Sequence, residues 1–263
     1  MKNNILANKT LRYIWTHPNC QDRKFVAILR FFGWQFYKRL TNKTITIPLT
    51  SNIKMYCYPD SRSAATVIYC GLYDYHEMNF LLRFLCQEDS FLDIGANVGV
   101  YTLLAASQIH ASSLYSFEAL PKNYNRLLQN LELNGLQQIR THQIAISNSQ
   151  GYVTLYLSDG DSTPSITSHQ GKNTLQVESN TLNNLSKTLP LDNLTLGKID
   201  IEGAELLAFQ GANLLFEKQR PFVWILEILG KDNQDLVNFL HNYGYSLYQY
   251  NTDTNTLHQI ELA

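Results

Sequence analysis

The fold is decided by the stretch Ser90-Phe-Leu-Asp-Ile-Gly-Ala-Asn-Val-Gly-Val-Tyr-Thr-Leu-Leu-Ala-Ala106. An apolar run interrupted by Asp93 is followed by small or loop-forming residues at alternate positions, Gly95, Asn97 and Gly99, and then by a helical apolar pattern. The pattern predicts a buried strand that ends in a turn and opens a helix. Glycines in such a turn let the backbone approach a ligand closely and adopt angles that a side chain would forbid. The helix N-terminus behind it offers unpaired N–H groups to electron-rich ligand atoms. The stretch therefore predicts a site for a nucleotide-like cofactor.

The rest of the chain alternates predicted strands and helices, which is typical of a doubly wound, mostly parallel α/β sheet. The predicted strands span 91–94, 114–118, 139–147, 151–157, 196–201 and 222–228, with helices at 77–86, 100–109, 181–189, 204–215 and 232–243 and one between Pro121 and Gly135. A polar loop is expected at 158–174, and a final strand pair near residue 251. In such sheets, ligands bind beyond the carboxyl ends of the central strands. Acids follow or end four of these strands, at Asp93, Glu118, Asp200 and Glu227.

The N-terminal segment differs from the rest in charge. Residues 1–54 carry a net charge of +9 and the remainder −10. Residues 1–40 are predicted to be mainly helical and 44–58 to form a short hairpin, so we divide the chain into a basic extension, 1–60, and a cofactor-binding domain, 61–263. The aromatic, basic helix near 25–40 is of a kind that can lie on an anionic membrane. More commonly, such a helix packs on its own domain or on a second copy in a homodimer.

Cysteine usage and hydropathy favour a reducing cytoplasm as the compartment, with any membrane contact at the inner face. The four cysteines show no CxxC spacing and no pairing with nearby histidines, so neither a disulfide framework nor a zinc site is expected. No signal-peptide pattern and no apolar run of membrane-spanning length is visible.

Two cofactor classes compete for the glycine turn. The dinucleotide fingerprint is GxGxxG, whereas this turn has Gly95-x-x-x-Gly99, with Asn97 in place of a second glycine. Asp93 would repel a pyrophosphate but attract the ammonium and sulfonium of S-adenosylmethionine. Glu118, 19 residues after Gly99, is placed to accept hydrogen bonds from both ribose hydroxyls. The turn therefore favours S-adenosylmethionine over NAD.

Four segments resemble signature blocks of the FkbM-type methyltransferases, in the order expected for that family. They are Gly71-Leu-Tyr-Asp-Tyr-His-Glu77, the block starting at Phe91, Ser116-Phe-Glu-Ala-Leu-Pro-Lys-Asn-Tyr124 and Lys198-Ile-Asp-Ile-Glu-Gly-Ala-Glu205. The resemblance covers roughly residues 65–230, and it departs at Ala119, where the family commonly has proline. The family consists of class I S-adenosylmethionine-dependent enzymes, many of them O-methyltransferases of sugars or polyketides.

The resemblance implies a seven-stranded Rossmann-like sheet with an antiparallel C-terminal hairpin. It also implies cofactor-binding roles. The methionine part would lie near Asp93, Gly95, Asn97 and Gly99, the ribose on Glu118, and the adenine near Ala145 and Ile146, while Glu77 of the first block joins the cofactor-binding set.

The best candidate for chemistry is the block 198–205. Asp200 and Glu202 alternate along a strand that runs into a turn, and Glu205 opens the next helix. Close carboxylates raise one another's pKa, so one could serve as a general base near neutral pH. They could also hold a divalent cation, which we do not favour. Alternatively, Glu205 only complements the helix dipole and Asp200 contacts the cofactor's ammonium. His169, in the polar loop, and His76 are alternative bases.

These observations predict an S-adenosylmethionine-dependent methyltransferase that acts on a hydroxyl of a glycan, a glycan precursor or another small molecule. The alternatives are an NAD-dependent oxidoreductase and a non-catalytic scaffold with a methyltransferase-like fold. Nucleic acid is disfavoured as the acceptor, because the domain bearing the site is acidic.

Overall fold

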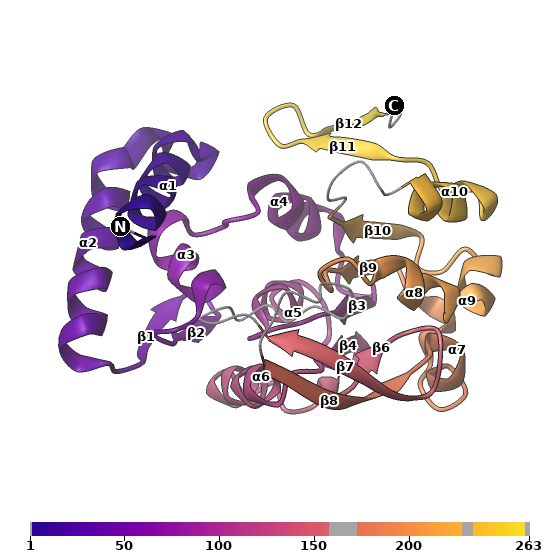
Figure 1. The fold of residues 1–263 in the computed structure, drawn as a ribbon. Helices are drawn as coiled ribbons and strands as arrows, with labels where there is room; N and C mark the ends of the chain where they lie inside the picture. The colour runs from indigo at the N-terminus through magenta and orange to yellow at the C-terminus, as the bar shows by residue number, and fades with distance from the viewer. Residues whose placement is uncertain (1, 158–172, 228–233, 261–263) are drawn as a thin grey trace.

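The computed structural model describes residues 2–157, 173–227 and 234–260, and the side chains of these from residue 9 onward. Figure 1 shows a central sheet flanked by helices, with the N-terminal helices to one side. The loop 158–172, which includes His169, lies outside the described residues.

The central sheet has five parallel strands in the order β10-β9-β3-β4-β5. They are β3 (Phe91–Ile94), β4 (Leu114–Phe117), β5 (Arg140–His142), β9 (Leu196–Ile199) and β10 (Val223–Leu226). The chain first builds outward from β3 through β4 to β5, then returns to the other side of β3 with β9 and β10. The predicted doubly wound parallel sheet is confirmed. The order reverses between β3 and β9, and this is where such sheets bind ligands.

The described residues hold five strands in this sheet, whereas the family resemblance implies seven. Three further strands, β6 (Ala145–Ile146), β7 (Gly151–Leu157) and β8 (Asn173–Asn180), form a separate sheet, and β11 (Tyr248–Asn251) pairs with β12 (Thr256–Gln259) as an antiparallel hairpin. The strand predicted over 139–147 is two strands, since β5 pairs with β4 whereas β6 pairs with β8. The sequence prediction also missed β8, in which the more buried Leu175 and Val177 alternate with exposed residues.

The two faces of the sheet are covered by different helices. Phe91, Leu114 and Leu196 pack with α4 (Tyr75–Phe84), α5 (Val100–Ala106) and α6 (Pro121–Leu133). Leu92, Phe117 and Ile199 pack with α7 (Leu182–Leu185), α8 (Glu205–Gln210), α9 (Asn213–Glu217) and α10 (Gln234–Asn242). Successive strand residues thus point to opposite faces, as the pleat requires. Short 3₁₀ helices lie at η2 (Ala111–Ser113) and η3 (Leu191–Asn193).

The N-terminal segment packs against the same apolar cluster as the first face of the sheet. Helix α1 (Lys2–Thr16) ends before Pro18, which opens the 3₁₀ helix η1 (Pro18–Arg23), and α2 (Lys24–Thr41) follows. The hairpin β1 (Ile45–Pro48)–β2 (Lys54–Cys57) and helix α3 (Arg62–Cys70) complete the segment. Ile14, Phe31 and Trp34 are buried in one cluster with Phe91 and Leu114. The division of the chain at residue 60 stays a prediction.

The turn after β3 follows the predicted strand–turn–helix pattern, and its glycines adopt the predicted angles that disfavour a side chain. Gly95, Asn97 and Gly99 all adopt left-handed backbone angles, with φ of 80°, 53° and 90°. A Cβ on Gly95 would overlap the backbone carbonyl oxygen of Asp200, at the end of the neighbouring strand. A Cβ on Gly99 would lie 2.5 Å from Leu127 Cδ1. Gly95 is therefore required by the protein's own backbone packing, and Gly99 is favoured by its positive φ, before any ligand is considered.

We expect Gly95→Ala to lower the free energy of unfolding by about 3 kcal/mol, because left-handed strain of about 1–2 kcal/mol adds to an overlap with backbone that cannot move easily. Gly135→Ala is the matched control, since Gly135 also has a positive φ, 68°, but open space where a Cβ would lie. It should cost only the strain. Urea denaturation of both variants measures how much each substitution lowers the free energy of unfolding. Equal losses would show that the overlap with Asp200 does not destabilise Gly95→Ala.

Candidate functional site

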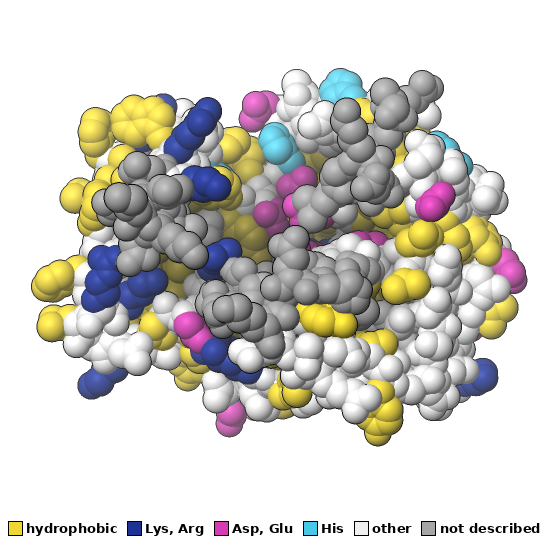
Figure 2. Space-filling view, in the orientation of Figure 1, with side chains coloured by type: hydrophobic (Ala, Val, Ile, Leu, Met, Phe, Trp, Pro, Cys, Tyr) yellow, Lys and Arg dark blue, Asp and Glu magenta, His cyan; other side chains and the backbone are white. Residues whose placement is uncertain are grey.

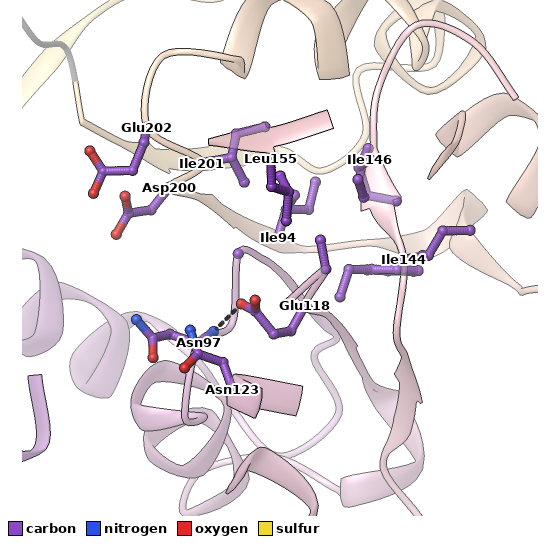
Figure 3. A pocket seen from close by; sticks show the side chains of 14 residues that line it. Ile94, Asn97, Glu118, Asn123, Ile144, Ile146, Leu155, Asp200, Ile201 and Glu202 are labelled. Atoms are coloured by element: carbon purple, nitrogen blue, oxygen red, sulfur yellow. Dashed lines mark hydrogen bonds between the residues drawn. The ribbon is translucent and has the colours of Figure 1, made fainter. Parts of the chain in front are cut away.

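Two cavities lie at the carboxyl ends of the central strands, one on each side of the turn after β3. Gly95, Asn97 and Asp200 border both of them. The first cavity extends over Glu118 toward β6, and Figure 3 shows its lining. The second, of about 320 Å³, extends over Asp93 toward α4. An elongated ligand lying across the turn would contact both.

Glu118 follows β4 directly and is 5% exposed. Its Oε2 accepts a hydrogen bond from the Asn97 N–H (2.8 Å), and its Oε1 accepts one from the Leu120 N–H (2.8 Å). Burial raises the pKa of Glu118 to about 7, although these two backbone donors act in the opposite direction. The carboxylate is thus held rigidly at the cavity wall, and its remaining lone pairs are available to a hydroxyl donor.

The far wall of the first cavity is apolar. Ala145 and Ile146, the residues predicted near an adenine, form β6 and line this cavity together with Ile144 and Leu155. A flat aromatic ring is the kind of group that such a wall accommodates. The residue types of Ala145 and Ile146 do not by themselves predict a binding site. The place of these two residues in the cavity depends on the pairing of β6 with β8.

Asp93 is buried within the sheet, with no exposed surface. It lies in register with Ser116 of β4 on one side and Lys198 of β9 on the other. Its Oδ2 accepts a hydrogen bond from Thr102 Oγ1 (2.6 Å), and that hydroxyl also lies 2.8 Å from Ser116 Oγ. Burial raises the pKa of Asp93, while Lys198 and Thr102 oppose the rise.

Lys198 was quoted in the sequence block but not recognised as a site residue. It is 5% exposed, its Nζ lies 3.2 Å from Asp200 Oδ2, and the same nitrogen lies 4.6 Å from the centre of the Tyr101 ring. Burial alone would lower the pKa of Lys198, but the carboxylates of Asp200, Asp93 and Asp74 outweigh it and raise the pKa. One buried ammonium therefore balances several carboxylates of the second cavity.

Asp74 was also missed, although it lies within the quoted segment 71–77. Its Oδ2 accepts a hydrogen bond from the Tyr101 hydroxyl (2.9 Å), and it lines the second cavity beside Glu77. Burial raises the pKa of Asp74 to about 6, partly offset by that hydrogen bond. Glu227, at the end of β10, faces the same cavity, and burial followed by repulsion from Asp200 raises its pKa.

The four residues predicted for catalysis do not lie together as one group. Asp200 and Glu202 follow β9 and line the first cavity, with carboxylates that point the same way in Figure 3. Glu205 lines neither cavity; its Oε1 accepts hydrogen bonds from the N–H groups of Ile201 (3.1 Å) and Gly203 (3.2 Å). This geometry supports the alternative in which Glu205 holds the turn at the start of α8. His169 lies outside the described residues.

His76, the other histidine considered as a base, is engaged elsewhere. Its Nδ1 lies 2.9 Å from Thr252 Oγ1, a residue beyond the C-terminal end of β11. Among the residues lining the two cavities, no histidine occurs within the described part of the chain. Carboxylates are the candidate bases among these described lining residues.

The N-terminal segment holds the loop that carries Asp74. The Tyr73 carbonyl accepts a hydrogen bond from the Tyr13 hydroxyl (2.6 Å) and lies 2.8 Å from His17 Nε2. Asn19 Nδ2 donates to the Cys70 carbonyl (2.5 Å). These bonds join α1 and η1 to the chain immediately before α4, so elements far from the sheet fix one wall of the second cavity.

His17, Cys20 and Cys70 correct the expectation that no cysteine pairs with a histidine. All three are buried, and their potential ligand atoms lie within 4.8 Å of one another. Both nitrogens of His17 are already engaged, because Nδ1 accepts the Asn19 N–H (3.2 Å) while Nε2 contacts Tyr73. Burial raises the pKa of the Cys70 thiol. The cluster therefore fits a packed joint between η1 and α3 better than a metal centre.

The two cavities together have a pronounced negative character. They are lined by one lysine, Lys198, and seven acids: Asp74, Glu77, Asp93, Glu118, Asp200, Glu202 and Glu227. Figure 2 shows acidic side chains gathered in the hollow between the N-terminal helices and the rest of the molecule. Such a site attracts cations and hydroxyl donors and repels phosphates.

Comparison with known proteins gives a family match. A family model described as the methyltransferase FkbM domain matches residues 93–247, which is more than half of the chain. Methyltransferase 1 of Beauveria bassiana (strain ARSEF 2860) is 26% identical over 146 residues, covering 47% of this chain. The chain spans 59% of that relative's length.

Two solved structures are similar at low identity. A crystal structure of methyltransferase FkbM from Methylobacillus flagellatus KT gives a TM-score of 0.47 at 16% identity, covering 74% of this chain and 52% of that one. A precorrin 8w decarboxylase from Methanobacterium thermoautotrophicum gives 0.41 at 14% identity, covering 71% and 83%. At these values, the likeness says nothing about activity.

Proposed function

Because the chain belongs to the FkbM methyltransferase family, we propose that it transfers a methyl group from S-adenosylmethionine to a hydroxyl oxygen of a glycan or glycan precursor. The observation that supports this most directly is the set of hydrogen-bond acceptors around the turn after β3, on Asp93, Asn97 and Glu118. The family assignment also leaves the NAD-dependent oxidoreductase without support.

The residues present fit a cationic cofactor. Asp93 Oδ1 and Asn97 Oδ1 are buried and have no hydrogen-bond partner among the residues that the structure describes, and both residues line the second cavity. Buried acceptors are costly unless a donor reaches them, so these atoms call for a ligand with N–H groups or positive charge. The ammonium of the methionine part meets that need, and a pyrophosphate does not.

Each part of the cofactor has a matching wall. Glu118 would accept the ribose hydroxyls, Ala145 and Ile146 would lie against the adenine, and Asp93 with Asp200 would face the ammonium. S-adenosylmethionine supplies, when bound, a methyl group attached to a positively charged sulfur. The chain's own task is then to orient the acceptor oxygen and to remove its proton.

We assign proton removal to Glu202. Asp200 borders both cavities and is paired with Lys198, so it contributes charge, whereas Glu202 follows it two residues further along the same turn. Its backbone has a φ of 55°, an uncommon value for a glutamate, which directs the residue away from the path of β9. The role needs no metal ion.

A glycan acceptor is supported by the chemistry of the second cavity. Asp74, Glu77 and Glu227 offer carboxylate oxygens to hydroxyl donors, with Ser63 and Tyr73 beside them. A phosphate-rich acceptor such as nucleic acid would be repelled by the same carboxylates.

Isothermal titration with S-adenosylhomocysteine tests cofactor binding. We expect Asp93→Asn and Glu118→Gln each to weaken binding by about tenfold to a hundredfold, the loss of roughly 1.5–3 kcal/mol for a hydrogen bond to a charged group. Glu217→Gln, an exposed acid remote from both cavities, is the control. Folded wild-type protein that binds NAD, or that does not bind S-adenosylhomocysteine, would refute the assignment.

Binding should also depend on pH through Glu118. Its pKa is about 7 in the folded protein, against 4.5 in a free side chain, so part of it is protonated at neutral pH. Ribose hydroxyls donate to the ionised form, and affinity should therefore rise with pH up to about 7, by at most tenfold per pH unit, and then level off. Stability without ligand should fall over the same range, because the unfolded chain ionises first. Glu118→Gln should weaken both trends, and the part of the stability trend that Asp74 contributes should remain; trends unchanged in that variant would contradict the prediction.

Incubation of the protein with fractionated cell material and S-adenosylmethionine labelled in its methyl group tests the identity of the acceptor. We expect label in glycans or their precursors as an O-methyl group, identified by mass spectrometry, and not in nucleic acid. Glu202→Gln should lower kcat by about a hundredfold or more, the usual contribution of a general base, with the affinity for S-adenosylhomocysteine unchanged. Full cellular function in Asp93→Asn and Glu118→Gln cells would instead favour a scaffold.

A further inference from the structure

Helix α2 exposes an apolar stripe along its whole length. Phe25, Leu29, Phe32, Phe36 and Leu40 are 76%, 70%, 54%, 70% and 73% exposed. Their spacing of three and four residues places them on one face of the helix. Large apolar side chains scattered singly on a surface are ordinary, but a contiguous row of five indicates an interaction surface.

The opposite face of α2 is firmly packed, so the stripe cannot turn inward. Ala27, Phe31 and Trp34 are buried in the main apolar cluster. The Phe31 ring lies 5.3 Å from the Tyr69 ring of α3, centre to centre. In Figure 1, α2 lies at the edge of the molecule away from the sheet. The packing of its buried face therefore keeps the stripe of α2 exposed to solvent.

Helix α1 extends the stripe with a further aromatic residue. Trp15 is 47% exposed, and its ring lies 6.2 Å from the Phe25 ring, edge to face. Lys24 Nζ lies 5.1 Å from the centre of the same Trp15 ring. Tryptophan beside a lysine is a combination that suits the boundary between lipid tails and headgroups.

Basic side chains surround the stripe. Arg30 and Arg39 are exposed and follow the two sides of the stripe along α2. Between residues 9 and 54, the chain has nine basic side chains and one acid, Asp22; the basic residues are Lys9, Arg12, Arg23, Lys24, Arg30, Lys38, Arg39, Lys43 and Lys54. Figure 2 shows hydrophobic and basic side chains intermixed on this side of the molecule.

We propose that the exposed stripe of α2, with Trp15, docks the protein on a membrane surface that carries anionic lipids. The apolar side chains would enter the headgroup region while the arginines and lysines remain with the anionic headgroups. No helix within the described ranges is long and apolar enough to cross a bilayer, so the contact is with the surface. A symmetric dimer through the same face is disfavoured, because it would oppose two sets of like charges.

Docking would also bring the site close to the lipid surface. The buried face of α2 packs on α3, and Ser63 of α3 lines the second cavity. Helices α2 and α3 are therefore the elements that lie between the docking face and that wall. This geometry favours an acceptor glycan that is carried on a lipid anchor, an inference that rests on the proposed function.

Flotation of the full chain with vesicles tests the proposal without cofactor or acceptor. We expect binding to vesicles of phosphatidylcholine with phosphatidylglycerol, weak binding to phosphatidylcholine alone, and release at high salt through screening. Leu29→Ser with Phe36→Ser should reduce binding at least tenfold, and Arg30→Gln with Arg39→Gln should remove the preference for anionic lipid.

The matched control is Leu214→Ser with Phe222→Ser, which changes two exposed apolar residues remote from α2 and should bind as wild type. Titration with S-adenosylhomocysteine should be unchanged in all these variants, so a failure of docking is distinguishable from a failure of the proposed function. Equal binding to both vesicle types, or none, would overturn the proposal. So would a dimer, seen by light scattering, that Leu29→Ser with Phe36→Ser dissociates.

Discussion

The burial of charge inside the sheet is the constraint on which this site depends. Asp93 lies in the middle of an apolar structure, where an isolated carboxylate would be protonated or would destabilise the fold. Lys198, one strand away and in register, supplies the compensating charge, and Thr102 supplies a hydrogen bond. The ammonium of Lys198 is in turn secured by Asp200. Asp93 of β3 and Asp200 after β9 are therefore linked electrostatically through the ammonium of Lys198.

The turn after β3 converts this charge arrangement into a binding surface. Its backbone passes so close to Asp200 that only glycine fits at position 95, and its Asn97 N–H secures Glu118. The same few residues thus border an apolar cavity on one side and an acidic cavity on the other. A cofactor with an apolar ring, hydroxyls and a cationic tail matches that order of surfaces.

Much of this could be predicted from the sequence, because strand, turn and helix leave strong local patterns. The parallel sheet, the turn and the placement of Glu118 at a strand end all follow from local spacing. The role of Glu205 could not be predicted, since its bonds to Ile201 and Gly203 depend on the path of the turn. The importance of Lys198 depends on strand order, and that of Asp74 on packing with Tyr101. The joint of His17 and Cys20 with Cys70 connects segments 50 residues apart.

The hydrogen bonds from Tyr13 and His17 to Tyr73 have a consequence for how such a protein can diversify. The family match begins at residue 93, whereas Ser63, Tyr73, Asp74 and Glu77 line the acidic cavity from outside it. The acidic cavity is therefore built from two separate stretches of chain. Changes in α1 or η1 that move Tyr73 can reshape one wall of this cavity while the strands that carry Asp93 and Lys198 stay unchanged.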